Sequence, residues 1–176
     1  DYKVTGVQTC ALPIYFGNTH IKAASFNKGE MAPIRRFDNI TDLLKASEFI
    51  QSHSNVIISS VTNDHQLFIQ TYEKKLNCVL FTADTIIPLK NLYKSTSTLG
   101  SDRLAASIGA FTFYPNKNVL TIDCGTCIKY NFTDDLNQYH GGGISPGLQL
   151  RFRSLNTYTA KLPLLQIDEG FNKLVG

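Results

Sequence analysis

Long apolar runs and strong charge of either sign are both missing from this sequence. No apolar stretch approaches the roughly 18 residues of a membrane span, and no charged start precedes an apolar segment and a cleavage site, as in a signal peptide. The net charge is only +3, and the basic cluster Arg151-Phe152-Arg153 is too short for a nucleic-acid-binding stripe. We therefore expect a cytoplasmic protein that binds neither membrane nor nucleic acid.

Metal-ligand patterns are scarce as well. Cys124 and Cys127 form a C-x-x-C, but the chain offers no second ligand pair at a spacing suited to structural zinc. The residues after Cys127 are typical of a strand, whereas a thioredoxin-type pair lies where a strand passes into a helix. The four histidines show no i,i+4 pair. We interpret the two cysteines as small side chains that flank a strand turn.

The two common glycine-rich nucleotide loops, G-x-x-x-x-G-K-[ST] and G-x-G-x-x-G, do not occur. Instead, Gly17-Asn18-Thr19 and Asp123-Cys124-Gly125-Thr126 each follow an apolar run and lead into a β-rich run, which predicts a hairpin with glycine at its tip. Glycine lets backbone N–H groups approach an anion, threonine adds a donor, and a neighbouring carboxylate can hold a cation. The pair predicts a duplicated fold that holds one nucleotide between two lobes.

Strands and helices alternate along the chain, which predicts an α/β fold. With 43% hydrophobic and 18% charged residues, the 176-residue chain can bury a core. Strands are predicted over 21–26, 32–37, 55–60, 78–82 and 119–122, helices over 41–52 (capped by Thr41), 64–76 and 104–113, and a loop over 90–98. Fewer residues follow the second glycine turn than separate the two turns, so we expect the chain to stop inside its second lobe.

Two loop segments have both a structural and a functional interpretation. Gly100-Ser101-Asp102-Arg103 precedes the helix predicted over 104–113 and places a carboxylate and a guanidinium together. Ser101 or Asp102 could cap this helix, or the segment could supply a catalytic acid-base pair. The segment from Lys90 through Tyr93 to Leu99 is more typical of a plain surface loop.

The segment His140-Gly141-Gly142-Gly143-Ile144-Ser145-Pro146-Gly147 contains the H-G-G-G and G-x-S-x-G patterns of a serine hydrolase. Such an enzyme uses the N–H of the residue after the nucleophile in its oxyanion hole, and Pro146 has none. We favour a loop that passes close to a bulky ligand and leads into a helix near Pro146, with a flexible hairpin tip as the alternative.

Four motifs in this order resemble the type III pantothenate kinases, members of the acetate and sugar kinase, heat-shock ATPase and actin superfamily. The resemblance begins near residue 15 and continues to the end of the chain. The motifs are Gly17-Asn18-Thr19-His20-Ile21-Lys22, Gly100-Ser101-Asp102-Arg103, Asp123-Cys124-Gly125-Thr126 and Gly142-Gly143-Ile144-Ser145-Pro146-Gly147.

The resemblance implies a duplicated ribonuclease-H-like (actin-like ATPase) fold with a nucleotide cleft between a first lobe at 15–115 and an incomplete second lobe at 116–176. It also implies ATP-dependent phosphorylation of pantothenate to 4'-phosphopantothenate, the first step of coenzyme A biosynthesis, by a homodimer whose pockets are completed by the partner subunit. Asp102 would then be the general base and Asp123 the ligand of a monovalent cation, K⁺ or NH₄⁺. Tyr93, Gly100, Ser101, Asp102 and Arg103 would bind pantothenate, while Gly17, Asn18, Thr19, His20, Ile21, Lys22 and Thr126 would bind ATP phosphates with Mg²⁺.

The chain departs from the family pattern in two places. The family has an aspartate two places before the first glycine, and here that residue is Tyr15. Pro13 would also remove a hydrogen bond from the ladder of the expected central strand, because proline has no N–H to donate. We therefore interpret residues 1–14 as a foreign segment. The family places a threonine that touches pantothenate in a C-terminal part that this chain does not include.

With these departures, we expect the chain to be weakly active or inactive. A non-catalytic regulatory relative, or a kinase for another small hydroxylated substrate, remain alternatives. Retention of Asp102 favours the kinase.

Overall fold

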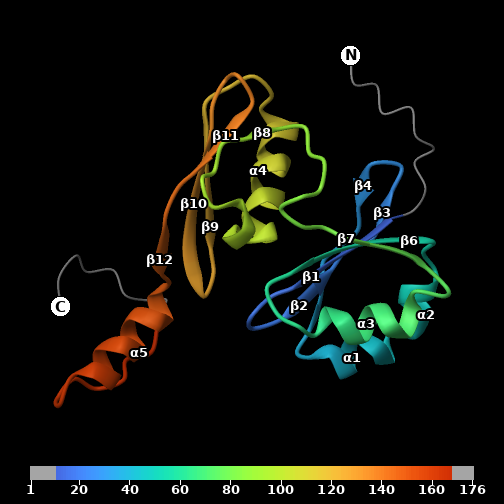
Figure 1. Cartoon of the computed structure of the whole chain (residues 1–176). Helices are drawn as coiled ribbons and strands as arrows, with labels where there is room; N and C mark the ends of the chain where they lie inside the picture. Colours follow the sequence, from blue (N-terminus) through green and yellow to red (C-terminus); the bar gives the residue numbers. More distant parts are fainter. Residues whose placement is uncertain (1–10, 168–176) are drawn as a thin grey trace. The chain divides into compact units, whose positions relative to one another are not determined.

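The computed structural model describes residues 11–167 (Figure 1). The chain forms two compact units, the first made of residues up to Pro88 together with Tyr93–Gly109, and the second of Leu89–Leu92 together with the residues from Ala110 onward. None of the described helices is long and apolar enough to span a membrane. The lobe boundary expected after residue 115 stays a prediction.

The first unit contains a mixed sheet with β1 in the middle. On one side β1 pairs with the antiparallel strand β2, which pairs with β5; on the other side it pairs with the parallel strand β6, which pairs with β7. The elements are β1 (Ala11–Phe16), β2 (Ile21–Ala23), β3 (Phe26–Asn27), β4 (Glu30–Met31), β5 (Arg35–Phe37), α1 (Ile40–Lys45), α2 (Ser47–Gln51), β6 (Asn55–Ser60), α3 (His65–Tyr72), β7 (Asn77–Leu80), the 3₁₀ turn Thr96–Thr98 and most of α4 (Ser101–Phe113).

The core of this unit lies between the sheet and the helices α1, α2 and α3, which cover one face in Figure 1. Alternate residues of β1, namely Leu12, Ile14 and Phe16, are at most 1% exposed and contribute one side of this core. The helices contribute buried side chains such as Leu43 and Phe68. This packing fixes β1, and with it the turn that follows β1.

Pro13 lies within this central strand, opposite Ile57 of β6. Proline cannot donate to a ladder, but its carbonyl accepts the Ala24 N–H at 3.2 Å, and the strand pairs on both sides. Residues 11–14 are therefore part of the sheet. The foreign origin that we inferred for residues 1–14 stays a prediction, and residues 1–10 lie outside the described part of the chain.

Two local predictions for the first unit are wrong. The helix expected over 41–52 is two short helices, because the backbone leaves the helical region at Ala46, where ψ is 37°. The cap of α1 is Asn39 rather than Thr41, and its side chain accepts the Asp42 N–H at 3.0 Å. A hairpin between β3 and β4 was also not predicted; it turns at Lys28 and Gly29, both with positive φ.

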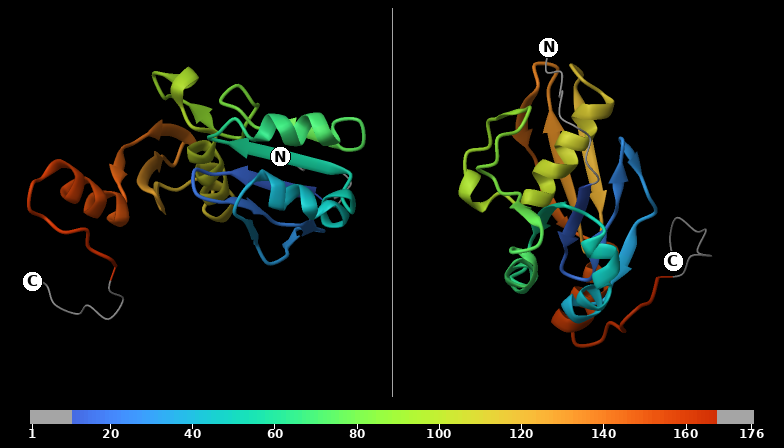
Figure 2. Two further views of the ribbon diagram at one scale, coloured as in Figure 1. Left: turned by 90° about the horizontal axis from the view of Figure 1, so that it is seen from below. Right: turned by 90° about the vertical axis from the view of Figure 1, so that its right-hand side faces the viewer.

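The second unit is built around β10 (Cys127–Thr133). This strand pairs with the antiparallel strand β9 along one edge, and with β12 and then β11 along the other. Further elements are β8 (Lys90–Asn91), β9 (Val119–Cys124), β11 (Gln138–Gly141), β12 (Ile144–Pro146), the end of α4 and α5 (Leu148–Tyr158). In Figure 2, α5 follows β12 at the red end of the chain.

Both units thus contain a run of three neighbouring antiparallel strand positions. In the first unit these are filled by β1, β2 and β5; in the second they are filled by β9, by β10 and, in the third position, by β11 and β12 together. Each set begins with a glycine-tipped hairpin, as predicted. The predicted α/β class and the duplicated ribonuclease-H-like pattern are confirmed by this repeated strand order.

Two segments expected to be loops contain regular structure. The segment 140–147 includes the end of β11 and all of β12, and the stretch from Lys90 includes β8, which pairs in parallel with β11. The helix that we expected near Pro146 is α5, which begins at Leu148.

Candidate functional site

The first glycine turn joins β1 to β2. The Gly17 N–H donates to the His20 carbonyl at 3.2 Å, which closes the turn over Asn18 and Thr19. A Cβ at Gly17 would lie 2.8 Å from Cε1 of Tyr15 and 3.0 Å from the His20 carbonyl oxygen. A larger residue at position 17 would therefore crowd the Tyr15 ring and the His20 carbonyl in this tight turn.

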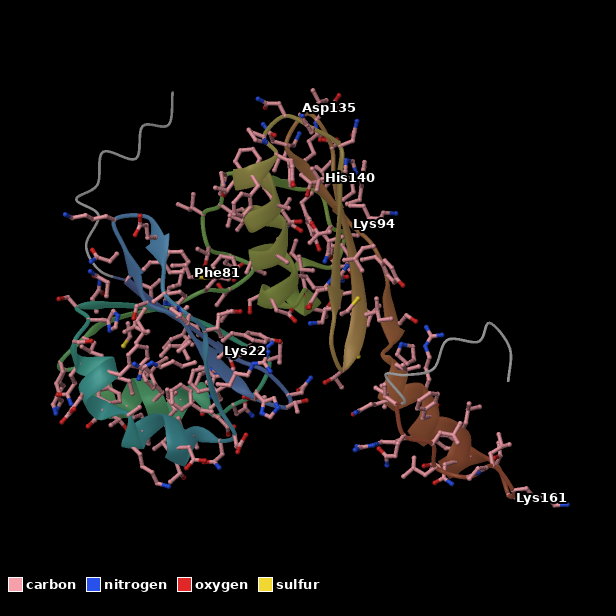
Figure 3. All side chains as sticks on the ribbon, turned by 180° about the vertical axis from the view of Figure 1, so that it is seen from behind. Lys22, Phe81, Lys94, Asp135, His140 and Lys161 are labelled. Atoms are coloured by element: carbon pink, nitrogen blue, oxygen red, sulfur yellow. The ribbon has the colours of Figure 1, made fainter. Side chains whose placement is uncertain are left out.

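The remaining residues predicted to form the first phosphate loop differ in their surroundings. Ile21 is 3% exposed and belongs to the core, so only its backbone can face a ligand. The His20 Nδ1 atom lies 3.3 Å from a carboxylate oxygen of Asp38. Lys22, labelled in Figure 3, is exposed on β2 opposite Tyr15. Lys22 is thus the residue of this loop whose charged side chain is open to solvent.

The predicted G-S-D-R segment forms the start of α4. Ser101 is buried, and its hydroxyl lies 3.0 Å from the hydroxyl of Ser59 and donates to the Ser60 carbonyl at 3.5 Å. These contacts tie the first turn of α4 to the carboxyl end of β6. Ser101 therefore anchors the helix to the sheet with its side chain.

Asp102 is held by contacts on both of its carboxylate oxygens. Its Oδ1 accepts the backbone N–H of Arg103 at 2.9 Å, and its Oδ2 accepts the Tyr15 hydroxyl at 3.3 Å. A Cβ at Gly100 would lie 2.5 Å from Oδ1, so this carboxylate position requires glycine there. The Tyr15 contact joins residues 87 positions apart and was not predicted.

Arg103 is 5% exposed although it carries a guanidinium. Its Cζ atom lies 5.3 Å from the centroid of the Tyr93 ring, within the range of a cation–π contact. Tyr93 thus contributes to the surroundings of the G-S-D-R segment. The interpretation of the segment from Lys90 to Leu99 as a plain surface loop is wrong, since it contains this contact and the strand β8.

The second glycine turn joins β9 to β10. Its Gly125 N–H donates to the Cys127 carbonyl at 3.0 Å, and its Thr126 carbonyl accepts the Gly147 N–H at 3.0 Å. A Cβ at Gly147 would lie 2.7 Å from the Thr126 oxygen and would also collide with the Gly125 carbonyl. The G-G-x-I-x-P-G segment thus packs its last glycine directly against the predicted second phosphate loop.

This contact brings a helix N-terminus to the turn, because Gly147 is the N-cap of α5. Arg151, in the first turns of α5, donates to the Pro146 carbonyl at 2.9 Å and to the Ser145 hydroxyl at 2.7 Å. A helix N-terminus carries partial positive charge and exposed N–H donors, which favours an anion at this place.

Glycines in the segment 140–147 allow this segment to pack closely against other backbone of the same unit. A Cβ at Gly142 would collide with the Tyr130 carbonyl of β10, whereas Gly143 has open space around it. Gly142 and Gly147 are thus explained by contacts with the unit's own backbone, and the prediction that this segment passes close to a ligand stays a prediction.

Asp123, the residue predicted to bind a monovalent cation, is paired within the sheet. Its Oδ2 lies 3.0 Å from Nζ of Lys129, which stands directly opposite in the β9–β10 ladder. Lys129 was not identified from the sequence. The prediction of a hairpin with Gly125 at its tip contained the necessary signal, because it places these two residues across from each other.

The serine hydrolase alternative receives no support from this geometry. The Ser145 hydroxyl accepts from Arg151, and the His140 Nε2 lies 2.7 Å from a carboxylate oxygen of Asp134. That contact is the largest cause lowering the pKa of Asp134 below its usual value; two backbone N–H donors add to it, and partial burial opposes it.

Within residues 11–167, no group of three or more His, Cys, Asp or Glu side chains is placed to hold a metal ion. Cys124 and Cys127 are free thiols that flank the second turn, as we had interpreted them.

Comparisons with known proteins agree with the motif order. A Flavobacterium johnsoniae protein described as "Type III pantothenate kinase" is 40% identical over 162 residues, which cover 90% of this chain and 66% of the relative. A Phocaeicola vulgatus protein with the same description is 39% identical over 154 residues, covering 86% and 64% respectively. The chain thus spans slightly less than two thirds of the length of these relatives.

Similar solved structures include a Ppx/GppA family member from Aquifex aeolicus, with a TM-score of 0.49 and 11% identity over 83% of this chain and 54% of that one. YeaZ from Pseudomonas aeruginosa has a TM-score of 0.40 and 7% identity over 78% of this chain and 67% of that one. The family model described as "Type III pantothenate kinase" matches residues 11–176. With its four motifs in order and these relatives, the chain belongs to the type III pantothenate kinase family.

Proposed function

We propose that the protein to which this sequence belongs transfers the γ-phosphoryl group of ATP to the primary hydroxyl of pantothenate. The observation that carries the proposal is the position of Asp102 at the first turn of α4, where its carboxylate lies over Gly100 and next to the buried Arg103. A fixed carboxylate of this kind can accept the proton of an alcohol as the alcohol attacks phosphorus.

In this reaction the pantothenate hydroxyl oxygen forms a bond to the γ-phosphorus, while the bond to the oxygen that bridges the β- and γ-phosphates breaks. ADP leaves with the electron pair, and the hydroxyl proton passes to the Asp102 carboxylate. Phosphoryl transfer depends mainly on alignment and on neutralisation of charge. The guanidinium of Arg103, with Tyr93, Gly100 and Ser101, would hold pantothenate beside the base.

The two glycine turns would hold the phosphates of ATP, the first through Gly17, Asn18, Thr19, His20 and Lys22 with the backbone of Ile21, and the second through Thr126. The second turn is supported by the α5 N-terminus that Gly147 places against it. Mg²⁺ would be bound mainly by the nucleotide and by water, as it commonly is at phosphate sites. A homodimer in the cytoplasm, with pockets completed by the partner subunit, belongs to the same proposal.

One observation favours a non-catalytic relative as the second candidate. Where the family has an aspartate, this chain has Tyr15, and the Tyr15 hydroxyl donates to Asp102. A carboxylate offers about four acceptor positions, and this contact uses one that a substrate hydroxyl could otherwise occupy. The chain with Tyr15 is therefore expected to turn over slowly.

A coupled ADP-release assay with Mg-ATP, with and without pantothenate, tests the kinase against the non-catalytic relative. We expect pantothenate-dependent ADP release to rise in Tyr15→Asp and to fall about 10²–10⁴-fold when Asp102→Asn is added. Asp84→Asn is the matched control, since Asp84 is an exposed carboxylate of the same unit. ADP release that does not depend on pantothenate, or that is unchanged by Asp102→Asn, would contradict the proposal.

A further inference from the structure

The ion pair of Asp123 and Lys129 lies close to the second glycine turn. The two residues face each other in the β9–β10 ladder, and their charged atoms are 3.0 Å apart. The Lys129 side chain is 18% exposed and that of Asp123 is 47% exposed. The register thus holds a mostly buried lysine side chain against a half-exposed aspartate side chain.

A bare carboxylate at this position would oppose phosphate binding. Asp123 is two residues before Gly125, so its negative charge lies near the place where we propose that Thr126 contacts a phosphate. Two like unit charges about 4 Å apart repel by about 1 kcal/mol in bulk water, and by more in a less polar medium. A cation at Asp123 removes this repulsion, and the family resemblance would assign that cation to solvent K⁺ or NH₄⁺.

The surroundings of Asp123 do not fit a free monovalent cation. The carboxylate oxygen Oδ2 is already in contact with Nζ of Lys129, which carries the same charge as NH₄⁺ and similar N–H donors. Side chains directly opposite in an antiparallel pair have Cβ atoms only about 4.5–5.5 Å apart, so the register of the ladder places the Lys129 ammonium group beside the Asp123 carboxylate. A solvent cation on Oδ2 would have to displace this tethered ammonium group, and a cation on another acceptor position of the carboxylate would lie beside a charge of the same sign.

We propose that the Lys129 ammonium is the resident cation of the second glycine turn, so that this chain does not require K⁺ or NH₄⁺ there. The benefit to phosphate binding rests on the proposed function, whereas the replacement of a free cation at Asp123 does not. Lys129 acts through Asp123 and is in this sense a positioning residue for the nucleotide phosphates.

The replacement can be tested without nucleotide by thermal unfolding of the chain in KCl, NH₄Cl, NaCl and choline chloride at equal ionic strength. The unchanged chain should melt at the same temperature in all four salts. Lys129→Met exposes the Asp123 carboxylate and should melt about 2–4 °C higher in KCl or NH₄Cl than in choline chloride, if the cation contributes a typical binding free energy.

Three further variants serve as controls. Lys161→Met removes a lysine past the end of α5, labelled in Figure 3, and should behave like the unchanged chain. Lys129→Arg keeps the charge and should remain indifferent to the salt. Adding Asp123→Asn to Lys129→Met removes the carboxylate and should abolish the preference for K⁺ and NH₄⁺.

Two results would overturn the inference. One is a K⁺-specific rise in melting temperature of the unchanged chain as large as that of Lys129→Met, and the other is no cation preference in Lys129→Met. ATP titration in the same salts addresses the phosphates separately: Lys129→Met should bind ATP more weakly in choline chloride than in KCl. If the unchanged chain binds no ATP in any salt, the proposed function fails while the melting comparison still decides the cation.

Discussion

Gly147 offers a direct test of how the second glycine turn is built. Its φ of −69° and ψ of 170° are open to any residue, so an alanine here meets only a steric obstacle. The added Cβ would lie 2.7 Å from the Thr126 carbonyl oxygen, well inside the 3.4 Å at which ordinary contact begins. Both colliding groups are backbone atoms of the turn, so the turn and the start of α5 must separate and lengthen the Gly147–Thr126 hydrogen bond.

We therefore expect Gly147→Ala to lower the free energy of unfolding by about 1–3 kcal/mol, the usual cost of forcing atoms into a closely packed place. The corresponding fall in melting temperature is about 2–4 °C for each kcal/mol. ATP affinity should fall as well, because the displaced turn no longer presents Thr126 correctly. Thermal unfolding and calorimetric ATP titration measure the two effects.

Gly143→Ala is the matched control in the same segment. A Cβ at Gly143 meets no atom within 4 Å, so alanine should fit there without strain. The free energy of unfolding should stay unchanged or rise by about 0.4–1 kcal/mol, because alanine lowers the conformational entropy of the unfolded chain. If the two alanine variants lost stability equally, or if Gly147→Ala lost none, the close contact between the second turn and α5 would not exist as described.

Three other outcomes follow from contacts described above. Phe68→Ala, which empties a fully buried position between α3 and the sheet, should cost about 3–5 kcal/mol in chemical denaturation, and a loss below 1 kcal/mol would contradict the described core. The His140 contact lowers the pKa of Asp134, so it stabilises the fold above the ordinary carboxyl pKa, and this stabilisation is lost on acidification. The free energy of unfolding of Asp134→Asn should therefore fall less between about pH 6 and about pH 3 than that of the unchanged chain. An equal fall would refute this. Tyr15→Phe frees an acceptor position on Asp102, so pantothenate-dependent ADP release should show a lower KM, and an unchanged KM would mean that the phenol does not compete with the substrate.

The sequence was sufficient to predict the two glycine hairpins and the order of most strands, because each depends on local patterns. An apolar run, a glycine and a β-rich run describe β1 to β2 and β9 to β10 without any knowledge of distant residues. The break at Ala46 was missed, since the apolar periodicity continues through it and the change of ψ leaves no signal in the residue types. The role of Gly142 was missed for a related reason: a glycine needed against the backbone of another strand looks the same as one in a loop.

The candidate site was predictable in its motifs but not in its contacts. The hydrogen bond from Tyr15 to Asp102 joins two elements far apart in the chain, and no periodicity connects them. Similarly, the attachment of Ser101 to Ser59 depends on where β6 ends in three dimensions. The roles assigned to Asp102, Asp123 and the glycine turns stay predictions.

The central place of β10 has a consequence for how this chain can change over evolutionary time. Side chains alternate between the two faces of a strand, so moving β10 by one residue against β9 would turn Lys129 to the opposite face and bring its neighbours into its place. The length of the connection at Gly125 and Thr126 therefore matters more than any one side chain near it. One inserted residue there would change both the charges and the side-chain packing along the β9–β10 ladder, whereas most single replacements would alter only one of them.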